Sequence, residues 1–372
     1  MREAEGLIGN PGGIHAEAVA AKEVLENARD KVAHELGAKS REIIFTSGLT
    51  ESINLAILGS VRRLTIQGQG LPLDQGLPLY STHWVVSSIE HSAVLESFAE
   101  IERLGGTVTH LDPDERGIFT AENVAQAIRS ETVLVSLGWA NNEIGAVQPI
   151  RDISRAVKAK NPKVLLHSDA GQAPLYLSPQ VHTLGVDLMS FGSNKLYGPH
   201  GVGALYAGKN AAIAPIILGG GQERGLRSGT ENVALAAGFA AAFQQITKER
   251  ESESLRLQKL RDTFTREIIA LIPSTVVNGD LKRSLPHMLN ISIPNIQSEY
   301  VALSLDQKGI AISTKSACAE GGAKESHVVA ALVSESWKAE NTLRFSLGRE
   351  TTKRDLEEVV KTLVYIFQKT KG

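Results

Sequence analysis

Two charged residues follow apolar stretches typical of buried strands, and together they could carry out imine chemistry on a pyridine ring. Asp169 ends the stretch Val164–Ser168, and Lys195 comes shortly after Leu188–Phe191. A buried carboxylate needs a cationic or hydrogen-bonding partner, and a protonated ring nitrogen would serve. A desolvated lysine loses its proton and can bind an aldehyde covalently. The pair indicates a pyridoxal 5′-phosphate (PLP) site, and the alternatives are an aspartate bonded to backbone amides and a solvated surface lysine.

The turn after the first predicted strand could hold a phosphate group. Ser47, Gly48 and Leu49 form a polar turn that contains glycine, and a helical pattern begins near Thr50. Backbone N–H groups at a helix N-terminus and a hydroxyl such as that of Thr50 suit an anion. A helix start that Thr50 caps without any ligand is the alternative interpretation.

Short apolar stretches alternate with helical patterns in the first part of the chain, which is typical of a parallel sheet covered on both faces. The predicted fold class is therefore α/β. Sheets of this kind bind ligands at the carboxyl ends of their strands. We expect strands at Glu42–Thr46, Trp84–Ser88, Val108–Leu111, Thr132–Ser136, Val164–Asp169, Leu188–Phe191 and Gly203–Tyr206.

A long helix from about Asn232 to Ile272 is predicted to link this large domain to a small α+β domain, because the stretch lacks turn signals until Pro273. The predicted domains are residues 10–240 and 241–372, and residues 1–9 are a short N-terminal remnant. A surface loop is predicted at Gln67–Pro78. In the small domain we expect strands at Met288–Ile293, Ile310–Ser313 and Thr342–Ser346, and helices at Ser298–Lys308 and Thr352–Lys369.

The composition excludes several classes of protein. The 372 residues carry a formal net charge of −2, which gives no long-range attraction to nucleic acid or acidic membranes. No apolar stretch approaches the roughly 20 residues that span a bilayer, and the N-terminus has no secretion or transit pattern, so we expect a cytoplasmic protein. The one cysteine, Cys318, excludes an internal disulfide. Its surroundings, Ser313–Lys324, contain no large apolar residue, so we expect an exposed loop.

Six segments of the chain, taken in order, closely resemble those of cysteine desulfurases. They are Phe45–Ser52, Ile89–Leu95, Asn141–Gly145, Gly220–Thr230, Ser316–Cys318 and Leu343–Arg349. The resemblance runs from about Gly9 to the C-terminus and is to the NifS/IscS-like class, which has the longer, mobile cysteine loop. It implies a fold-type I aminotransferase architecture, PLP as cofactor, and removal of sulfur from L-cysteine.

The resemblance also implies roles for residues around the PLP ring. Lys195 would bind PLP covalently and move protons, and Asp169 would keep the ring nitrogen protonated. Gln172 would donate a hydrogen bond to the phenolic oxygen of the ring. His91 would stack on the ring and move protons on the substrate, and Asn142 would lie beside the ring, in contact with cofactor or substrate.

The same resemblance assigns the phosphate contacts. They would come from the backbone of Leu49 and from Thr50, Ser193 and Thr230. Thr230 would belong to the second subunit of a homodimer, so that the two active sites are shared.

Two further residues are implied to act on the substrate. Arg344 would bind the carboxylate of L-cysteine through a planar, two-pronged contact. Cys318 would attack the substrate sulfur as a thiolate, leaving L-alanine and a persulfide on Cys318. A sulfur-acceptor protein, such as an iron–sulfur cluster scaffold, would then take the sulfur.

The chain departs from the family pattern at Gly192 and Asn194, where most relatives have serine and histidine, and Ser193 is expected to supply the missing hydroxyl. Upstream of Gly9–His15 the extended Asn/Thr-rich segment of relatives is absent. From this we expect a more open pocket and slow turnover of L-cysteine. The alternative functions are a selenocysteine lyase, a cysteine sulfinate desulfinase, or a catalytically weak partner protein, and Cys318 favours sulfur transfer.

Overall fold

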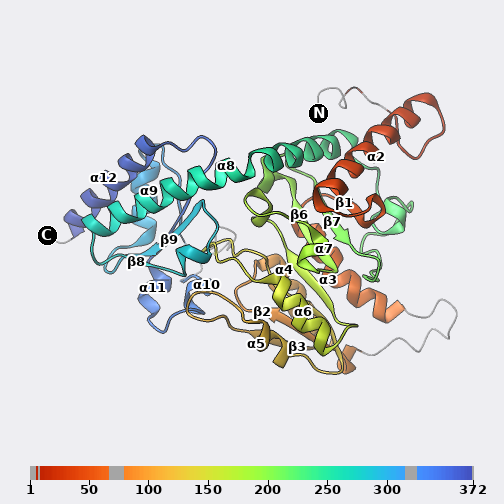
Figure 1. Ribbon diagram of the computed structural model, residues 1–372, viewed down its shortest axis with the longest axis horizontal. Coiled ribbons are helices and arrows are strands. Elements are labelled where there is room, and N and C mark those ends of the chain that lie inside the picture. Colours follow the sequence, from red (N-terminus) through yellow and green to blue (C-terminus); the bar gives the residue numbers. More distant parts are fainter. Residues whose placement is uncertain (1–5, 7–8, 67–78, 315–324, 371–372) are drawn as a thin grey trace. The chain divides into compact units, whose positions relative to one another are not determined.

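The computed structural model describes residues 6, 9–66, 79–314 and 325–370, and the chain divides into two compact units (Figure 1). Unit 1 comprises Met1–Leu111, Thr120–Trp139 and Gln148–Glu249, and unit 2 comprises Asp112–Phe119, Ala140–Val147 and Arg250–Gly372. The division falls inside helix α8 (Val233–Leu271). The domain boundary at residue 240 stays a prediction, and the predicted loop Gln67–Pro78 lies outside the described residues.

Unit 1 contains a seven-stranded sheet with the order β1-β7-β6-β5-β4-β2-β3. Strand β7 runs antiparallel to its neighbours β6 and β1, and the other pairs are parallel. The predicted α/β class with a mostly parallel sheet is therefore confirmed. The strands are β1 (Ile43–Thr46), β2 (His83–Ser87), β3 (Thr107–Leu111), β4 (Thr132–Ser136), β5 (Leu165–Asp169), β6 (Leu188–Gly192) and β7 (Gly203–Ala207).

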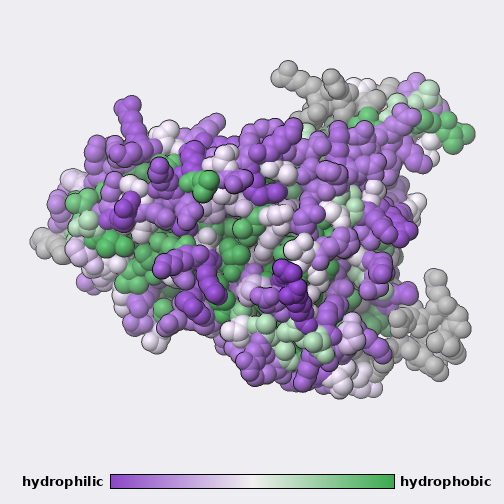
Figure 2. Space-filling model, viewed as in Figure 1, coloured by the Kyte–Doolittle hydropathy of each residue, from purple (hydrophilic) through white to green (hydrophobic). Residues whose placement is uncertain are grey.

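Helices pack around this sheet because each carries an apolar face. Helix α3, for example, packs against strands β6 and β7 and helix α4, and it buries Ile53, Leu55, Ala56 and Ile57. The face of the molecule in Figure 2 is mostly hydrophilic, with hydrophobic patches between the hydrophilic residues. The α-helices of unit 1, besides the start of α8, are α2 (Ala16–Leu36), α3 (Leu49–Ile66), α4 (Ser92–Arg103), α5 (Ala121–Gln126), α6 (Ile150–Lys160) and α7 (Val181–Leu184).

A buried polar ladder crosses the three central strands. His167 on β5 contacts the Ser136 hydroxyl on β4 through Nδ1 (2.8 Å) and the Ser190 hydroxyl on β6 through Nε2 (3.0 Å). All three side chains are fully buried. Burial lowers the pKa of His167 to about 3, so the imidazole is neutral and pairs one donor and one acceptor with the two hydroxyls.

Unit 2 contains a four-stranded antiparallel sheet with the order β10-β11-β9-β8. Phe264 of α8 packs edge-on against Phe345 of β11, with ring centroids 5.2 Å apart. The strands are β8 (Val276–Val277), β9 (Met288–Ser292), β10 (Ser313–Thr314) and β11 (Thr342–Ser346). The helices, besides the end of α8, are α9 (Ser298–Asp306), α10 (His327–Ala330), α11 (Ser336–Glu340) and α12 (Lys353–Thr370).

One strand prediction in unit 2 is wrong in position. The strand expected at Ile310–Ser313 is found at Ser313–Thr314. Within the described residues 310–314, only the last two pair with β11, while Ile310 follows directly on the turn after α9. Within the described residues, no helix combines the length and the apolar character that crossing a membrane requires.

Candidate active site

Asp169 and Lys195 lie at the ends of adjacent parallel strands. Strand β5 ends at Asp169, whose register partner on β6 is Ser190. Strand β6 ends at Gly192. Lys195 lies in the short 3-10 helix η4 (Ser193–Leu196) that follows. The strand ends therefore place both residues at one edge of the sheet, as the sequence predicts.

The electrostatics of Asp169 suit a cationic partner. Burial raises the pKa of Asp169 to about 6, against the opposing effects of the Gly171 N–H group and the positive charge of Lys195. The Gly171 N–H group donates to Asp169 Oδ1 at 2.8 Å. A carboxylate with a raised pKa is short of positive charge, and a protonated ring nitrogen would lower that pKa and stabilise the ionised form.

The turn between β1 and α3 packs directly on the ends of β6 and β7. A Cβ atom on Gly203 would lie 2.6 Å from the carbonyl carbon of Gly48, and one on Gly192 would lie 2.9 Å from Leu49 Cβ. In this chain a side chain at either strand position would therefore push the turn away. Inside the turn, the Thr46 and Ser52 hydroxyls lie 2.7 Å apart. This packing holds the N-terminal N–H groups of α3 beside the segment that carries Lys195.

Ser193 supplies a second polar group at this place. Its Oγ atom is buried and has no hydrogen-bond partner among the described residues. A buried hydroxyl without a partner is costly, and a phosphate oxygen is a suitable acceptor. Thr50 and Thr230, by contrast, are exposed, as expected of residues that bind a ligand or another subunit.

His91 is the N-cap residue of helix α4, which follows β2. Its Nδ1 atom accepts a hydrogen bond from the N–H group of Ala93 at 3.1 Å. In the neutral imidazole this leaves the proton on Nε2. The helix cap therefore fixes both the orientation and the tautomer of His91.

Glu90, the neighbour of His91, is a buried acid that the sequence analysis did not single out. Its side chain accepts the N–H group of Gly138 at 2.8 Å, and the residue is 5% exposed. Burial and, to a smaller extent, the charge of Asp169 raise the pKa of Glu90 to about 8, against the opposing effect of the hydrogen bond from Gly138. At neutral pH Glu90 is therefore uncharged. A cationic group that binds at this place would be attracted to Asp169 and not to Glu90.

In unit 2, Arg344 contacts the segment that contains Asn142. Its Nη1 atom donates to the Asn142 carbonyl oxygen at 3.0 Å, and its Nη2 atom donates to Ser313 Oγ at 2.9 Å. The Asn141 side chain accepts the N–H groups of Glu143 and Ile144 at 2.8 and 3.0 Å, which fixes the turn. Unit 2 therefore brings together two of the predicted substrate-binding residues.

Cys318 lies outside the described residues. The described chain stops before it at Thr314, which pairs with Leu343 on β11. Gln172 follows β5 at the start of the 3-10 turn η3 (Ala173–Leu175) and is partly exposed. The predicted roles of Gln172 and Cys318 stay predictions.

The chain matches the family described as Aminotransferase class-V over residues 2–359. It is 40% identical to the cysteine desulfurase IscS of Dictyoglomus turgidum, over 97% of this chain and 88% of that one. It is 37% identical to the cysteine desulfurase IscS 1 of Archaeoglobus fulgidus, over 98% of this chain and 91% of that one. The chain belongs to the cysteine desulfurase family of class-V aminotransferases.

Two solved structures are similar to the chain over nearly its whole length. A NifS-like protein superposes with a TM-score of 0.87 and 33% identity, covering 99% of this chain and 95% of that one. SspA in complex with cysteine superposes with a TM-score of 0.77 and 32% identity, covering 93% of this chain and 94% of that one. The cofactor of this cysteine desulfurase family member is PLP.

The residues of unit 1 fit PLP. Asp169 has a raised pKa that a pyridinium would relieve, and Ser193 has a buried hydroxyl that a phosphate would pair. Lys195 follows the neighbouring strand and carries the amine that the cofactor aldehyde requires. These three observations come from the described chain and are independent of the family membership.

Proposed function

We propose that the protein is a PLP-dependent cysteine desulfurase that transfers the sulfur of L-cysteine to Cys318. The observation that supports it best is the placement of Asp169 and Lys195 on adjacent strand ends in a member of this family. The structure of a relative in complex with cysteine supports L-cysteine as the substrate.

Bound PLP draws electron density away from the substrate and so weakens its Cβ–S bond. Lys195 holds the cofactor covalently and moves a proton on the substrate. His91 is fixed as a donor by its cap on α4, and it directs the Nε2 proton toward reacting atoms. Asp169 stays ionised and keeps the ring nitrogen protonated, while Gln172 hydrogen-bonds the phenolic oxygen.

Sulfur transfer requires a thiolate and a bound substrate carboxylate. Arg344 binds the carboxylate, and Asn142, in contact with Arg344 through its backbone, faces substrate or cofactor. The Cys318 thiolate attacks the substrate sulfur, so that an S–S bond forms while the Cβ–S bond breaks. The Cβ atom keeps the electron pair, takes up a proton and leaves as part of L-alanine.

The phosphate is bound by the N-terminus of α3 at Leu49, by Thr50 and by Ser193. Thr230 comes from the partner in a homodimer, and its exposure in unit 1 supports a contact outside its own subunit. A sulfur-acceptor protein, such as an iron–sulfur cluster scaffold, takes the persulfide sulfur. The cytoplasmic location expected from the sequence stays a prediction.

The test uses the single cysteine of the chain. Wild-type protein loaded with PLP and given L-cysteine should form L-alanine and gain one sulfur atom, which mass spectrometry of the protein maps to Cys318. Cys318→Ser should keep PLP and still change its absorption spectrum with L-cysteine, yet gain no sulfur. Sulfide release by the Cys318→Ser variant at the wild-type rate would refute the role of Cys318.

A further inference from the structure

Strand β1 is the edge of the seven-stranded sheet, and its outer side is covered by side chains instead of another strand. Among the strands that the structure describes, it pairs with β7 alone. On the outer side, the Ile43 carbonyl oxygen accepts Nη1 of Arg29 at 3.1 Å and Nη2 of Arg224 at 2.6 Å. The Phe45 N–H group donates to Glu223 at 3.0 Å. These side chains satisfy backbone groups that an edge strand leaves open.

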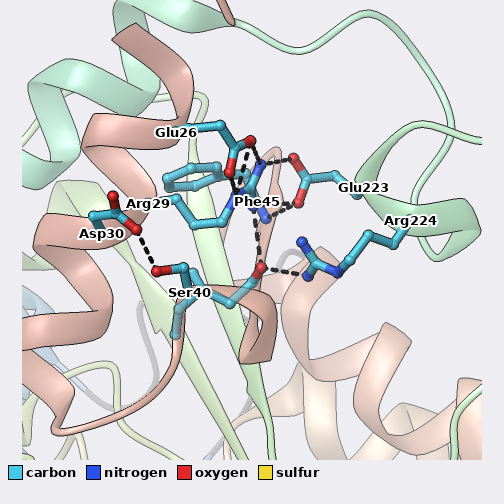
Figure 3. A network of polar contacts seen from close by, with 8 residues as sticks. Glu26, Arg29, Asp30, Ser40, Phe45, Glu223 and Arg224 are labelled. Atoms are coloured by element: carbon cyan, nitrogen blue, oxygen red, sulfur yellow. Dashed lines mark hydrogen bonds and ion pairs between the residues drawn. The ribbon is translucent and has the colours of Figure 1, made fainter. Parts of the chain in front are cut away.

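Arg29 and Glu223 form a paired, two-pronged contact at the centre of this arrangement (Figure 3). The Nη1–Oε2 distance is 2.6 Å and the Nη2–Oε1 distance is 2.8 Å. Their side chains are 3% and 1% exposed. The guanidinium of Arg29 also lies 4.9 Å from the centre of the Phe45 ring. We call Arg29, Glu223 and Arg224 the edge clamp.

The edge clamp joins β1 to a strained loop. Glu223 and Arg224 both have left-handed backbone conformations, with φ of 49° and 59°. Residues other than glycine rarely adopt this conformation, and it persists only where the surrounding contacts impose it. The clamp contacts to Ile43 and Phe45 are among those contacts, together with backbone hydrogen bonds inside the loop. The clamp therefore helps to set the path of the loop that leads to Thr230.

A second ion pair joins the same loop to the start of helix α3, directly after the turn Ser47–Thr50 that is proposed to bind the phosphate. Arg227 donates from Nε to Glu51 Oε1 at 2.8 Å and from Nη2 to Glu51 Oε2 at 3.2 Å. Glu51, in the first turn of α3, also accepts the Ser47 N–H group at 2.8 Å. The loop therefore contacts the strand before the turn and the helix after it.

We propose that Arg29 and Glu223 are positioning residues for the PLP phosphate. They hold the turn Ser47–Thr50 and the loop to Thr230 in one fixed arrangement. The inference rests on the proposed function, because it assumes that this turn binds the phosphate of PLP. It predicts that loss of the clamp weakens binding of the phosphate group while leaving recognition of the ring intact.

The chain offers a matched control at the opposite ends of the strands. Lys158 donates to Asp187 Oδ2 at 2.7 Å, and Asp187, which precedes β6, accepts the Leu166 N–H group at 2.8 Å. This ion pair also joins a helix to a sheet strand through a backbone contact. It lies one strand length away from the carboxyl ends, so its loss should affect stability without affecting the phosphate site.

The experiment compares binding of PLP with binding of pyridoxal, which has the ring and aldehyde but no phosphate. Arg29→Met should bind PLP at least tenfold more weakly than the wild type and pyridoxal equally well, as measured by absorption titration of the apoprotein. Lys158→Met should bind both as the wild type does. If Arg29→Met fails to fold, Glu223→Gln replaces it, because glutamine keeps the shape of the side chain. Glu223→Gln should also bind PLP more weakly than the wild type and bind pyridoxal equally well.

Two results would overturn the inference. One is wild-type PLP affinity in the clamp variants, and the other is an equal loss of affinity for PLP and pyridoxal. Failure of the wild-type protein to bind PLP would instead refute the proposed function, so the two failures are distinguishable.

Discussion

Replacing Glu90 with glutamine should make the protein more stable, by an amount that grows as the pH rises. Burial is the largest cause that raises the pKa of Glu90 from 4.5 to about 8, and the charge of Asp169 adds to it, while hydrogen bonds from Gly138 and Ser87 oppose it. In the unfolded chain the carboxyl group has its ordinary pKa. Glutamine keeps an acceptor for the Gly138 N–H group but cannot ionise.

The sign follows from proton binding. Between pH 4.5 and 8 the unfolded chain has lost a proton that the folded chain keeps, so stability falls as the pH rises through this window. At about 1.4 kcal/mol for each pKa unit, the full cost is roughly 5 kcal/mol above pH 8 and roughly 3 kcal/mol at pH 7. The group is 5% exposed, so little of this is lost to solvent screening.

The assay is urea unfolding of wild-type and Glu90→Gln holoprotein from pH 5 to pH 9. Trp84 and Trp139 are buried in unit 1, and their fluorescence reports its unfolding. The variant should gain little at pH 5 and several kcal/mol at pH 9, since other titrating groups cancel in the difference. Glu90→Leu also loses the Gly138 contact. Its free energy of unfolding should depend on pH as that of Glu90→Gln does, but it should be lower than that of Glu90→Gln at every pH.

A constant difference between the wild type and Glu90→Gln across the whole range would refute the reasoning. It would mean that Glu90 is ionised in the folded protein and that a second anion lies beside Asp169.

Three further experiments test individual roles. Asp169→Asn should keep the covalent link between PLP and Lys195, which mass spectrometry detects after borohydride reduction. The variant should have a lower kcat, because a neutral amide does not hold the ring nitrogen protonated. An unchanged kcat would contradict this role. Arg344→Ala should raise KM for L-cysteine by roughly tenfold to a hundredfold, for a lost charge-assisted contact of about 1.5–3 kcal/mol, and Arg344→Lys should restore part of it. Mixing Thr230→Ala protein with Lys195→Ala protein should restore activity as the subunits exchange. In a mixed dimer both changes fall in one active site and the other site is intact. No recovery of activity would argue against shared sites.

The long elements could be predicted from the sequence because their patterns are local. The helix expected from Asn232 to Ile272 is found as α8, Val233–Leu271. The two-residue strand β8 was not predicted, and the strand found as β10 was predicted to begin three residues too early. A strand of two residues is too short to show an alternation of apolar and polar residues, and its pairing with a neighbouring strand decides where it lies.

The candidate site shows the same limit. Asp169 and Lys195 were found because residue type and strand ends are visible in the sequence. Glu90 was missed because its pKa depends on burial in the folded chain and on contacts with residues that are distant in the sequence, such as Gly138, 48 residues away. Arg29 and Glu223 are 194 residues apart, and nothing in either local sequence indicates that they meet.

The polar ladder of Ser136, His167 and Ser190 has a consequence for how the sheet assembles. Apolar strands such as β4, β5 and β6 could slide past one another with little loss of hydrophobic contact. A slip of one residue would turn the imidazole to the other face of the sheet and leave three buried polar groups unpaired. Misaligned sheets are thereby penalised during folding, and the strand ends that carry Asp169 and Lys195 reach the same level only in the correct alignment.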